Sequence, residues 1–145
     1  MEMVNYYANI VVAVDGSKES ESAFRKAIHI ALRNVGANLI LVHIIDTQAS
    51  AVYDRLVLES AQKDSEDMLN VFKNEALSAG VERVETVVEF GSPRSMITKE
   101  LSTRLEADLI VCGAHGRTAV ERYLIGSVSE SIVRSATCDV LVVRS

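Results

Sequence analysis

Glycine and serine residues gather in one stretch of the chain, and their spacing is suited to phosphate binding. Two residues separate Gly113 from Gly116, nine separate Gly116 from Gly126, and Ser127 follows directly. Glycine lets the backbone approach a ligand closely and permits positive φ angles. The first turn of a helix has unpaired N–H groups and a partial positive charge, and the hydroxyls of Ser127 and Ser129 add donors. Each residue alone is more often structural, but together they predict a phosphate site.

Other polar side chains fall near the same glycines. Asp15 closes the first predicted strand, and its carboxylate can accept hydrogen bonds from ribose hydroxyls. His115 lies between two of the glycines and offers either its side chain or its backbone. Arg117 and Arg122 follow in the same loop, where a cation either screens phosphates or is simply solvated. We therefore treat Asp15 and His115 as site residues and leave the two arginines open.

The remaining reactive side chains fit structural roles better. His29 lies on a predicted helix, and His43 lies on a buried strand, where a core histidine with a satisfied hydrogen bond is the commoner case. Ser127 has no base beside it and lacks the G-x-S-x-G elbow of a nucleophile. No spacing of His, Cys and Asp suits a zinc site. The acidic residues of segment 50–79 are interpreted as the solvated face of a helix.

Five apolar runs alternate with helical patterns along the chain. Strands are predicted at 9–14, 39–45, 84–90, 109–112 and 140–143, and helices at 24–35, 50–79, 93–105 and 127–136. Continuous apolar runs indicate strands buried on both faces, and their alternation with helices indicates a parallel sheet. Polar interruptions place the third strand near an edge. Ligands bind beyond the carboxyl ends of such strands, where the glycines fall.

Length and composition indicate one globular domain over residues 1–145. The chain has 145 residues, 48% of them hydrophobic, which is enough to bury a core. No apolar run reaches the roughly 20 residues of a membrane span, and no signal peptide is recognised, so a cytoplasmic protein is expected. A net charge of −5 without a basic patch argues against nucleic acid as a partner. Cys112 and Cys138 fall at opposite ends of predicted strands, beyond disulfide reach.

The chain resembles the universal stress proteins over its whole length. The resemblance rests on VAVDGS at 12–17, on GSP at 91–93, and on the G-x2-G-x9-G-[ST] spacing described above. In the family, this last motif marks the ATP-binding subgroup. The resemblance implies an α/β fold with a doubly wound, five-stranded parallel sheet of order 3-2-1-4-5, flanked by helices, in a Rossmann-like arrangement.

The resemblance also implies binding residues and partners. Adenine would lie near Ala13, Asp15 and the backbone of Ile44. Ribose and phosphates would contact Gly113, His115, Gly116, Gly126, Ser127, Val128 and Ser129. A divalent cation, Mg or Mn, often accompanies the phosphates, and many members form homodimers through the last strand, here from Val140 to Val143. Some ATP-binding members have proline where this chain has Ala13, which is expected to alter the adenine wall slightly.

These observations predict an ATP-binding protein of stress response or signalling, whose nucleotide state alters what it binds. One alternative is an enzyme of the same superfold, either an ATP hydrolase or a phosphoryl or nucleotidyl transferase. No catalytic base can be assigned for such chemistry, so slow or no ATP turnover is expected. The other alternative is an interaction module without nucleotide, which the intact glycines disfavour. The choice among ATP, ADP, AMP and cyclic nucleotides stays open.

Overall fold

A computed structural model describes residues 6–47, 54–115 and 125–144 of the chain. Its elements are β1 (Asn9–Ala13), α1 (Lys18–Arg33), β2 (Asn38–Asp46), α2 (Arg55–Ser78), β3 (Arg83–Gly91), α3 (Pro93–Ser95), the π-helical turn η1 (Met96–Leu101), α4 (Ser102–Arg104), β4 (Leu109–Gly113), α5 (Ser127–Ser135) and β5 (Asp139–Val143). The described strands form one parallel sheet in the order β3-β2-β1-β4-β5. The predicted fold class, the strand order and the edge position of the third strand are confirmed.

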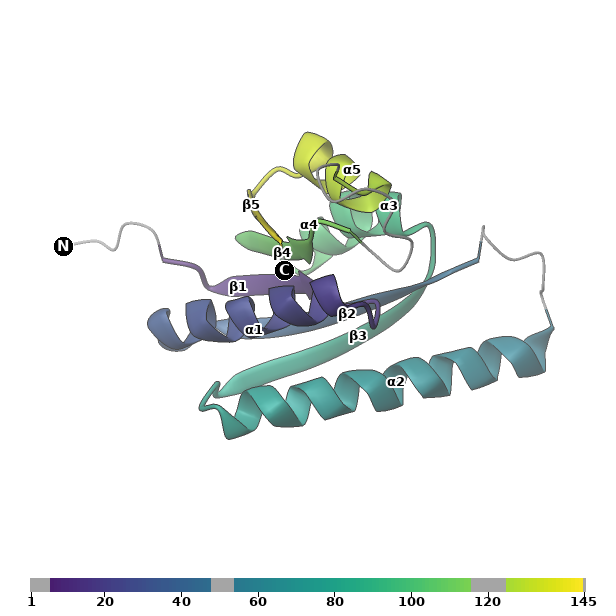
Figure 1. Cartoon of the computed structure of the whole chain (residues 1–145), viewed down its shortest axis with the longest axis horizontal. Helices are drawn as coiled ribbons and strands as arrows, with labels where there is room; N and C mark the ends of the chain where they lie inside the picture. The colour runs from purple at the N-terminus through teal and green to yellow at the C-terminus, as the bar shows by residue number, and fades with distance from the viewer. Residues whose placement is uncertain (1–5, 48–53, 116–124, 145) are drawn as a thin grey trace.

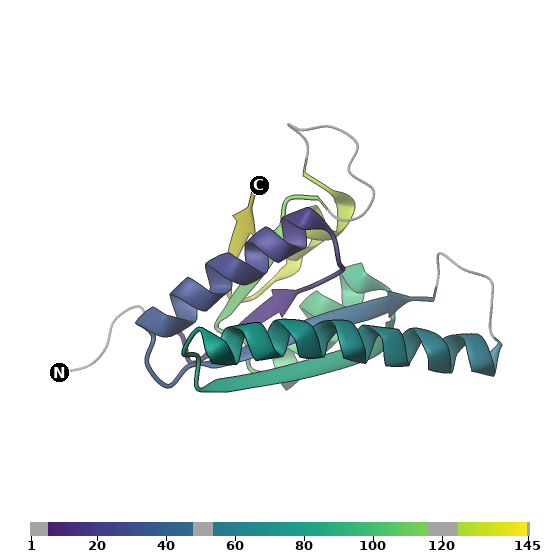
Figure 2. The same ribbon diagram turned by 60° about the horizontal axis from the view of Figure 1, so that its bottom comes forward.

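Helices cover both faces of the sheet (Figure 1). Figure 2 shows α1 and α2 across one face, and the segment from α3 to α4 lies with α5 on the other. Side chains of a strand alternate between faces. In β1, Ile10 and Val12 belong to the core under α1 and α2, and Val11 belongs to the core under the other helices. Because both faces are covered, the inner strands β1 and β4 are almost wholly apolar, whereas the edge strand β3 carries polar residues among its apolar ones.

The first helix is shorter at its C-terminal end than its apolar period predicts. α1 ends at Arg33, because the side-chain amide of Asn34 donates to the Ile30 carbonyl at 2.8 Å and the chain then turns through Gly36 at φ 85°. The predicted helix includes Val35 as the last residue of its apolar period, but Val35 lies beyond the helix and is 80% exposed. That prediction is wrong, because the apolar period carries no information on the capping role of Asn34.

The second helix packs along the same face as α1. Phe24 of α1 and Phe72 of α2 meet with ring centroids 5.0 Å apart, and Leu69 is fully buried beside them. The predicted start of this helix at residue 50 lies outside the described residues. None of the described helices is long and apolar enough to cross a membrane.

The sheet has a step at its carboxyl edge, because β2 projects beyond β1. The pairing of β1 with β2 ends at Ala13 and Val42, whereas β3 accompanies β2 as far as Asp46. The Val14 N–H adds one more bond, to the Val42 carbonyl at 2.8 Å. Beyond it, residues 43–46 of β2 pair with β3 on one side only. Their other side faces the space where β1 has ended.

Candidate functional site

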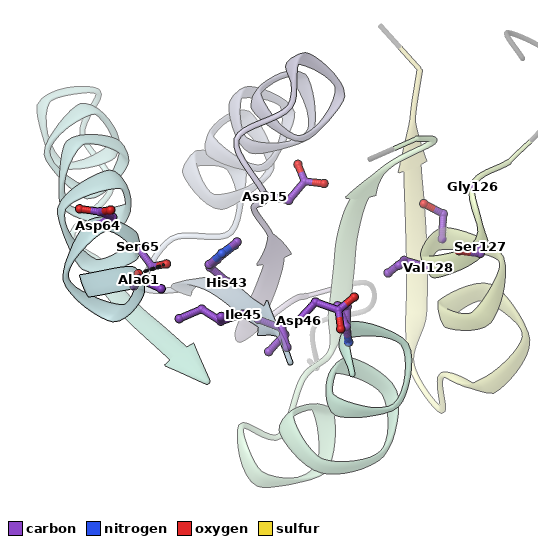
Figure 3. Close-up of a pocket in the computed structure, with 13 residues that line it drawn as sticks. Asp15, His43, Ile45, Asp46, Ala61, Asp64, Ser65, Gly126, Ser127 and Val128 are labelled. Atoms are coloured by element: carbon purple, nitrogen blue, oxygen red, sulfur yellow. Dashed lines mark hydrogen bonds between the residues drawn. The ribbon is translucent and has the colours of Figure 1, made fainter. Parts of the chain in front are cut away.

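A cavity of about 590 Å³ opens at this carboxyl edge. It lies where β1 has β2 on one side and β4 on the other, so the order of the strands reverses there. Open α/β sheets bind ligands at such switch points. Figure 3 shows α2 residues on one side of the cavity, the start of α5 on the other, and Asp15 and His43 between them. A smaller cavity of about 120 Å³ shares part of this lining.

The first turn of α5 presents unpaired N–H groups to the larger cavity. Gly126 precedes the helix at φ −65° and ψ 161°, and without a side chain it cannot cap the helix. Its own N–H donates to the Ala114 carbonyl at 2.7 Å, which fixes the turn. No described residue accepts from the N–H groups of Ser127, Val128 and Ser129, all of which line the cavity. These orphan donors and the positive end of the helix dipole make a site for an anion.

Gly113 is required by close packing. A Cβ atom added there would lie 2.7 Å from the Cβ of Glu19 and 2.8 Å from its carbonyl carbon. Only glycine therefore lets the start of α1 rest on the end of β4. Neither Gly113 nor Gly126 has a positive φ angle. The backbone conformation at these two positions therefore does not require glycine.

Ser129 fastens α5 to β4. Its hydroxyl donates to the Gly113 carbonyl, and its side chain is buried. Sequence reasoning assigned this hydroxyl to a phosphate, but the structure gives it an acceptor within the protein, and only the Ser129 N–H is without an acceptor among the described residues. Ser127, in contrast, is exposed at the mouth of the cavity.

The ends of β1 and β2 form the middle of the lining. Asp15 lines both cavities, and its Oδ1 accepts the Ser17 N–H at 2.9 Å, which orients the carboxylate. Ala13 lines the smaller cavity, and Ile44 lines both. Together with Val128 of α5 they form an apolar wall next to a fixed carboxylate. Such a combination of apolar surface with few polar groups is typical of small-molecule sites.

The three histidines have different surroundings. His29 is exposed on α1. His115 is 9% exposed and lines only the smaller cavity, and its buried Nε2 has no hydrogen-bond partner among the described residues. His43 is half-buried, and its Nδ1 lies 2.7 Å from the Val14 carbonyl oxygen. This bond fits the predicted structural role of His43, but the residue also lines both cavities, which the sequence did not indicate.

Sequence reasoning also missed the contribution of α2. Ala61, Asp64 and Ser65 line the larger cavity on the side opposite α5. The helical period predicts the inner face for Ala61 and Ser65, and Asp64 was interpreted as solvated. The only available signal was the one-turn spacing of the two small residues. That spacing does not show that α2 reaches past the end of β1.

Neither cysteine supplies a reactive thiolate near neutral pH. Both are free, and Cys112 is buried beneath the smaller cavity. Burial raises the pKa of the Cys112 thiol to about 11. Burial also raises the pKa of Cys138, which lies at the other end of the β4–β5 pair. Gly116, Arg117 and Arg122 lie outside the described residues.

A sequence model of the universal stress protein family matches residues 7–144. The chain belongs to the universal stress protein family. A universal stress protein of Staphylococcus saprophyticus is 50% identical over 142 residues, which cover 96% of this chain and 84% of that relative.

Solved universal stress proteins have the same fold as this member. The structure of UspA from Lactobacillus plantarum superposes with a TM-score of 0.85 at 28% identity, covering 97% of this chain and all of that one. A universal stress protein solved in complex with cAMP gives a TM-score of 0.75 at 27% identity, covering 97% and 98% of the two chains. Nucleotide binding therefore occurs among the structural neighbours of this universal stress protein.

The universal stress protein does not form a metal site with its described side chains. No group of three or more His, Cys, Asp or Glu residues is placed to hold an ion within the described part of the chain. Mg²⁺ is usually held by one or two carboxylates and by the phosphates of a substrate. Asp15 and Asp46 border the cavity, but the described residues alone do not account for a Mg or Mn site.

Proposed function

We propose that this universal stress protein binds an adenine nucleotide, ATP in particular, with its phosphates on the first turn of α5. One observation carries the proposal: Ser127, Val128 and Ser129 line a cavity, their N–H groups have no acceptor among the described residues, and they follow a glycine that cannot cap them. Helices normally satisfy such donors with a Ser, Thr, Asp or Asn side chain. Donors without an acceptor among the described residues, beside a cavity, favour an anionic ligand.

The rest of the nucleotide fits the remaining lining. Ala13, Ile44 and Val128 offer apolar contacts to a base, and the Asp15 carboxylate can accept from ribose hydroxyls. Gly113 and His115 border the smaller cavity beneath them. In this assignment the ligand bridges α5 and the ends of β1 and β2, and Val128 offers its N–H to the phosphates and its side chain to the base.

We propose binding without rapid turnover as the function, so that the nucleotide state regulates a stress or signalling interaction. Phosphoryl transfer generally requires cationic clamps and a positioned base or water-holding residue. The described lining of both cavities contains no Lys or Arg, and Asp15 is already engaged in a turn. These features favour retention of ATP over its hydrolysis. We also propose a cytoplasmic location, which suits two free cysteines.

Calorimetric titration with ATP tests the proposed site. The change Gly126→Val fills the mouth of the cavity, while the observed φ of −65° is accessible to valine, so the backbone can stay in place. The valine side chain should displace the phosphates and remove two of their charge-assisted hydrogen bonds to the α5 N–H groups. This loss should weaken ATP binding by at least about thirtyfold. Ser135→Val, at the exposed far end of the same helix, is the matched control and should bind normally. Undiminished binding by Gly126→Val would exclude this phosphate position.

We further propose a homodimer joined through β5. This strand is a sheet edge, and Val140, Leu141 and Val142 are each only partly buried in the single chain. Exposed apolar edges invite pairing and are usually covered in soluble proteins. A two-fold partner contributing the same strand would cover this edge and close the assembly.

A further inference from the structure

The strand β3 is the second edge of the sheet, opposite the edge formed by β5. It pairs with β2 alone, in an unbroken register of nine residues from Arg83 to Gly91. Figure 2 shows β3 at the margin of the sheet, with α2 running along it. Natural proteins protect such edges with short strands, proline, bulges or charged side chains. β3 is long, regular and free of proline, so only its charged side chains restrict pairing with a further strand.

The hydrogen bonds of β3 show which of its backbone groups are unpaired. The Thr47 N–H donates to the Gly91 carbonyl at 3.3 Å, so the backbone groups of Gly91 point toward β2. Successive residues of a strand turn their N–H and C=O groups to opposite sides, so the odd-numbered residues of β3 bond to β2. The even-numbered residues, which face the open edge, are Val84, Thr86, Val88 and Phe90. No described residue bonds to their backbone groups.

The two faces of β3 differ in the chemistry of their side chains. On the α2 face, Val84 and Val88 pack in the core, and Phe90 is 37% exposed near the end of the strand. The opposite face carries the carboxylates of Glu85 and Glu89. Side chains of neighbouring strands pair across the same face. A strand added at this edge would therefore meet apolar side chains on one face and acidic side chains on the other.

The charges of β3 favour a basic strand as its neighbour. Glu85 accepts from the side-chain amide of Asn38, a neutral group that does not offset its charge. Glu89 pairs with Arg104 at 2.9 Å, but both side chains are partly exposed, so this ion pair is weak. Arg83 is the single cation of β3, and the whole chain has a net charge of −5. Lys or Arg opposite the two glutamates would be attracted, whereas Asp or Glu would be repelled.

We infer that the β3 edge binds an extended segment of a partner protein, which pairs with β3 as a further strand and alternates apolar with basic residues. Main-chain hydrogen bonds to the outward-facing residues supply affinity, and pairing with Glu85 and Glu89 supplies selectivity. β2 separates this edge from the end of β1, where the proposed nucleotide site lies. Docking at β3 therefore goes beyond the proposed nucleotide binding and does not require a bound nucleotide.

Fluorescence anisotropy with labelled synthetic peptides tests the docking strand on the unmodified protein, without nucleotide. The probe is a seven-residue peptide in which valine alternates with lysine, and the comparison peptide has glutamate in place of lysine. The lysine peptide should bind about tenfold more tightly, and N-methylation of its backbone amides should abolish binding. Equal binding of the two peptides, no binding of either, or binding that survives N-methylation would overturn the inference. None of these results bears on the proposed function, which ATP titration tests separately.

Thr86→Pro tests whether backbone pairing is responsible. Proline removes the outward N–H of Thr86, which takes no part in the pairing with β2, and edge strands tolerate proline at such positions. Binding of the lysine peptide should fall about tenfold, whereas the control Thr86→Val keeps the N–H and should bind normally. Urea denaturation of both variants reports whether the fold is retained. Undiminished binding by a folded Thr86→Pro chain would refute the pairing.

Glu85→Gln tests selectivity without changing the backbone, and it remains informative if proline disturbs the strand. Removing one carboxylate should weaken binding of the lysine peptide about threefold and strengthen binding of the glutamate peptide. Glu106→Gln, which neutralises an exposed carboxylate outside β3, is the matched control and should leave both affinities unchanged. An unchanged peptide preference in Glu85→Gln would contradict the assignment.

Sedimentation equilibrium distinguishes a partner protein from a second copy of this chain. Without peptide, Thr86→Pro should sediment with the same mass as the wild type, because the proposed dimer is joined through β5. A lower mass for Thr86→Pro would show that a second copy occupies the β3 edge, and this result would also overturn the inference.

Discussion

At the scale of residues, the glycine-serine pattern has two separate uses. Gly126 provides no side-chain cap for the α5 donors at the cavity, whereas Gly113 and Ser129 bring three elements together. Gly113 admits the start of α1 against β4, and its carbonyl receives the hydroxyl of Ser129 from α5. The sequence identified all three residues but assigned them to phosphate. Spacing along the chain does not distinguish a contact with ligand from a contact with another helix.

Gly113→Ala should destabilise the fold. The added methyl would meet the Glu19 backbone at 2.8 Å, and backbone yields less readily than a flexible side chain. Overpacking of this kind costs about 1–3 kcal/mol. Urea denaturation measures the change, with Ser135→Thr at the exposed end of α5 as the methyl-adding control. An unchanged free energy of unfolding for Gly113→Ala would contradict the packing role.

The Cys112 thiol should make stability depend on alkaline pH. Its pKa is raised from 9.0 to about 11 by burial, so the folded state keeps the proton that the unfolded chain releases above pH 9. Stability is therefore full below pH 9 and falls as pH rises toward 11, by up to roughly 2–3 kcal/mol. Denaturation of the wild type and of Cys112→Ala across this range isolates the effect, because other groups titrate alike in both. Parallel pH profiles would disprove it.

At the scale of elements, the sequence predicted which segments are strands and helices but not where they stop. Apolar runs located the five strands of the described residues, because burial on both faces leaves the inner strands almost wholly apolar. The apolar runs did not reveal that β2 extends beyond β1 by residues 43–46, since the length of β2 depends on its pairing with β3. The α2 side of the cavity follows from this step. The α2 side of the cavity therefore could not be predicted from the sequence of any single strand.

The start of α1 is set by an N-cap, which the turn chemistry of residues 15–18 indicates but the apolar period does not. The Ser17 side chain accepts the Ser20 N–H at 3.2 Å, so the helix begins at Lys18, well before the first predicted helical residue. Ser17→Ala should cost about 1 kcal/mol, while Ser17→Asp should retain most of the stability. Thermal unfolding followed by circular dichroism compares the two. If alanine and aspartate were equally stable, the cap would contribute nothing.

At the scale of the whole molecule, the proposed dimer follows from the exposed edge at β5. Sedimentation equilibrium should find the unmodified chain as a dimer at about 100 µM, because pairing removes partly exposed valine and leucine side chains from water. The result should not require ATP, since β5 lies at the sheet edge rather than at the central cavity. A monomer at this concentration, with and without ATP, would contradict the dimer.

The central claim is that the first turn of α5 holds the phosphates of a nucleotide. Amide chemical shifts in a ¹⁵N-labelled sample titrated with ATP report on that turn directly. ATP should bind, and the amide signals of Ser127, Val128 and Ser129 should move together, with smaller changes at Asp15 and Ile44. ATP binding that leaves the three α5 amides unmoved, or no binding at all, would contradict it.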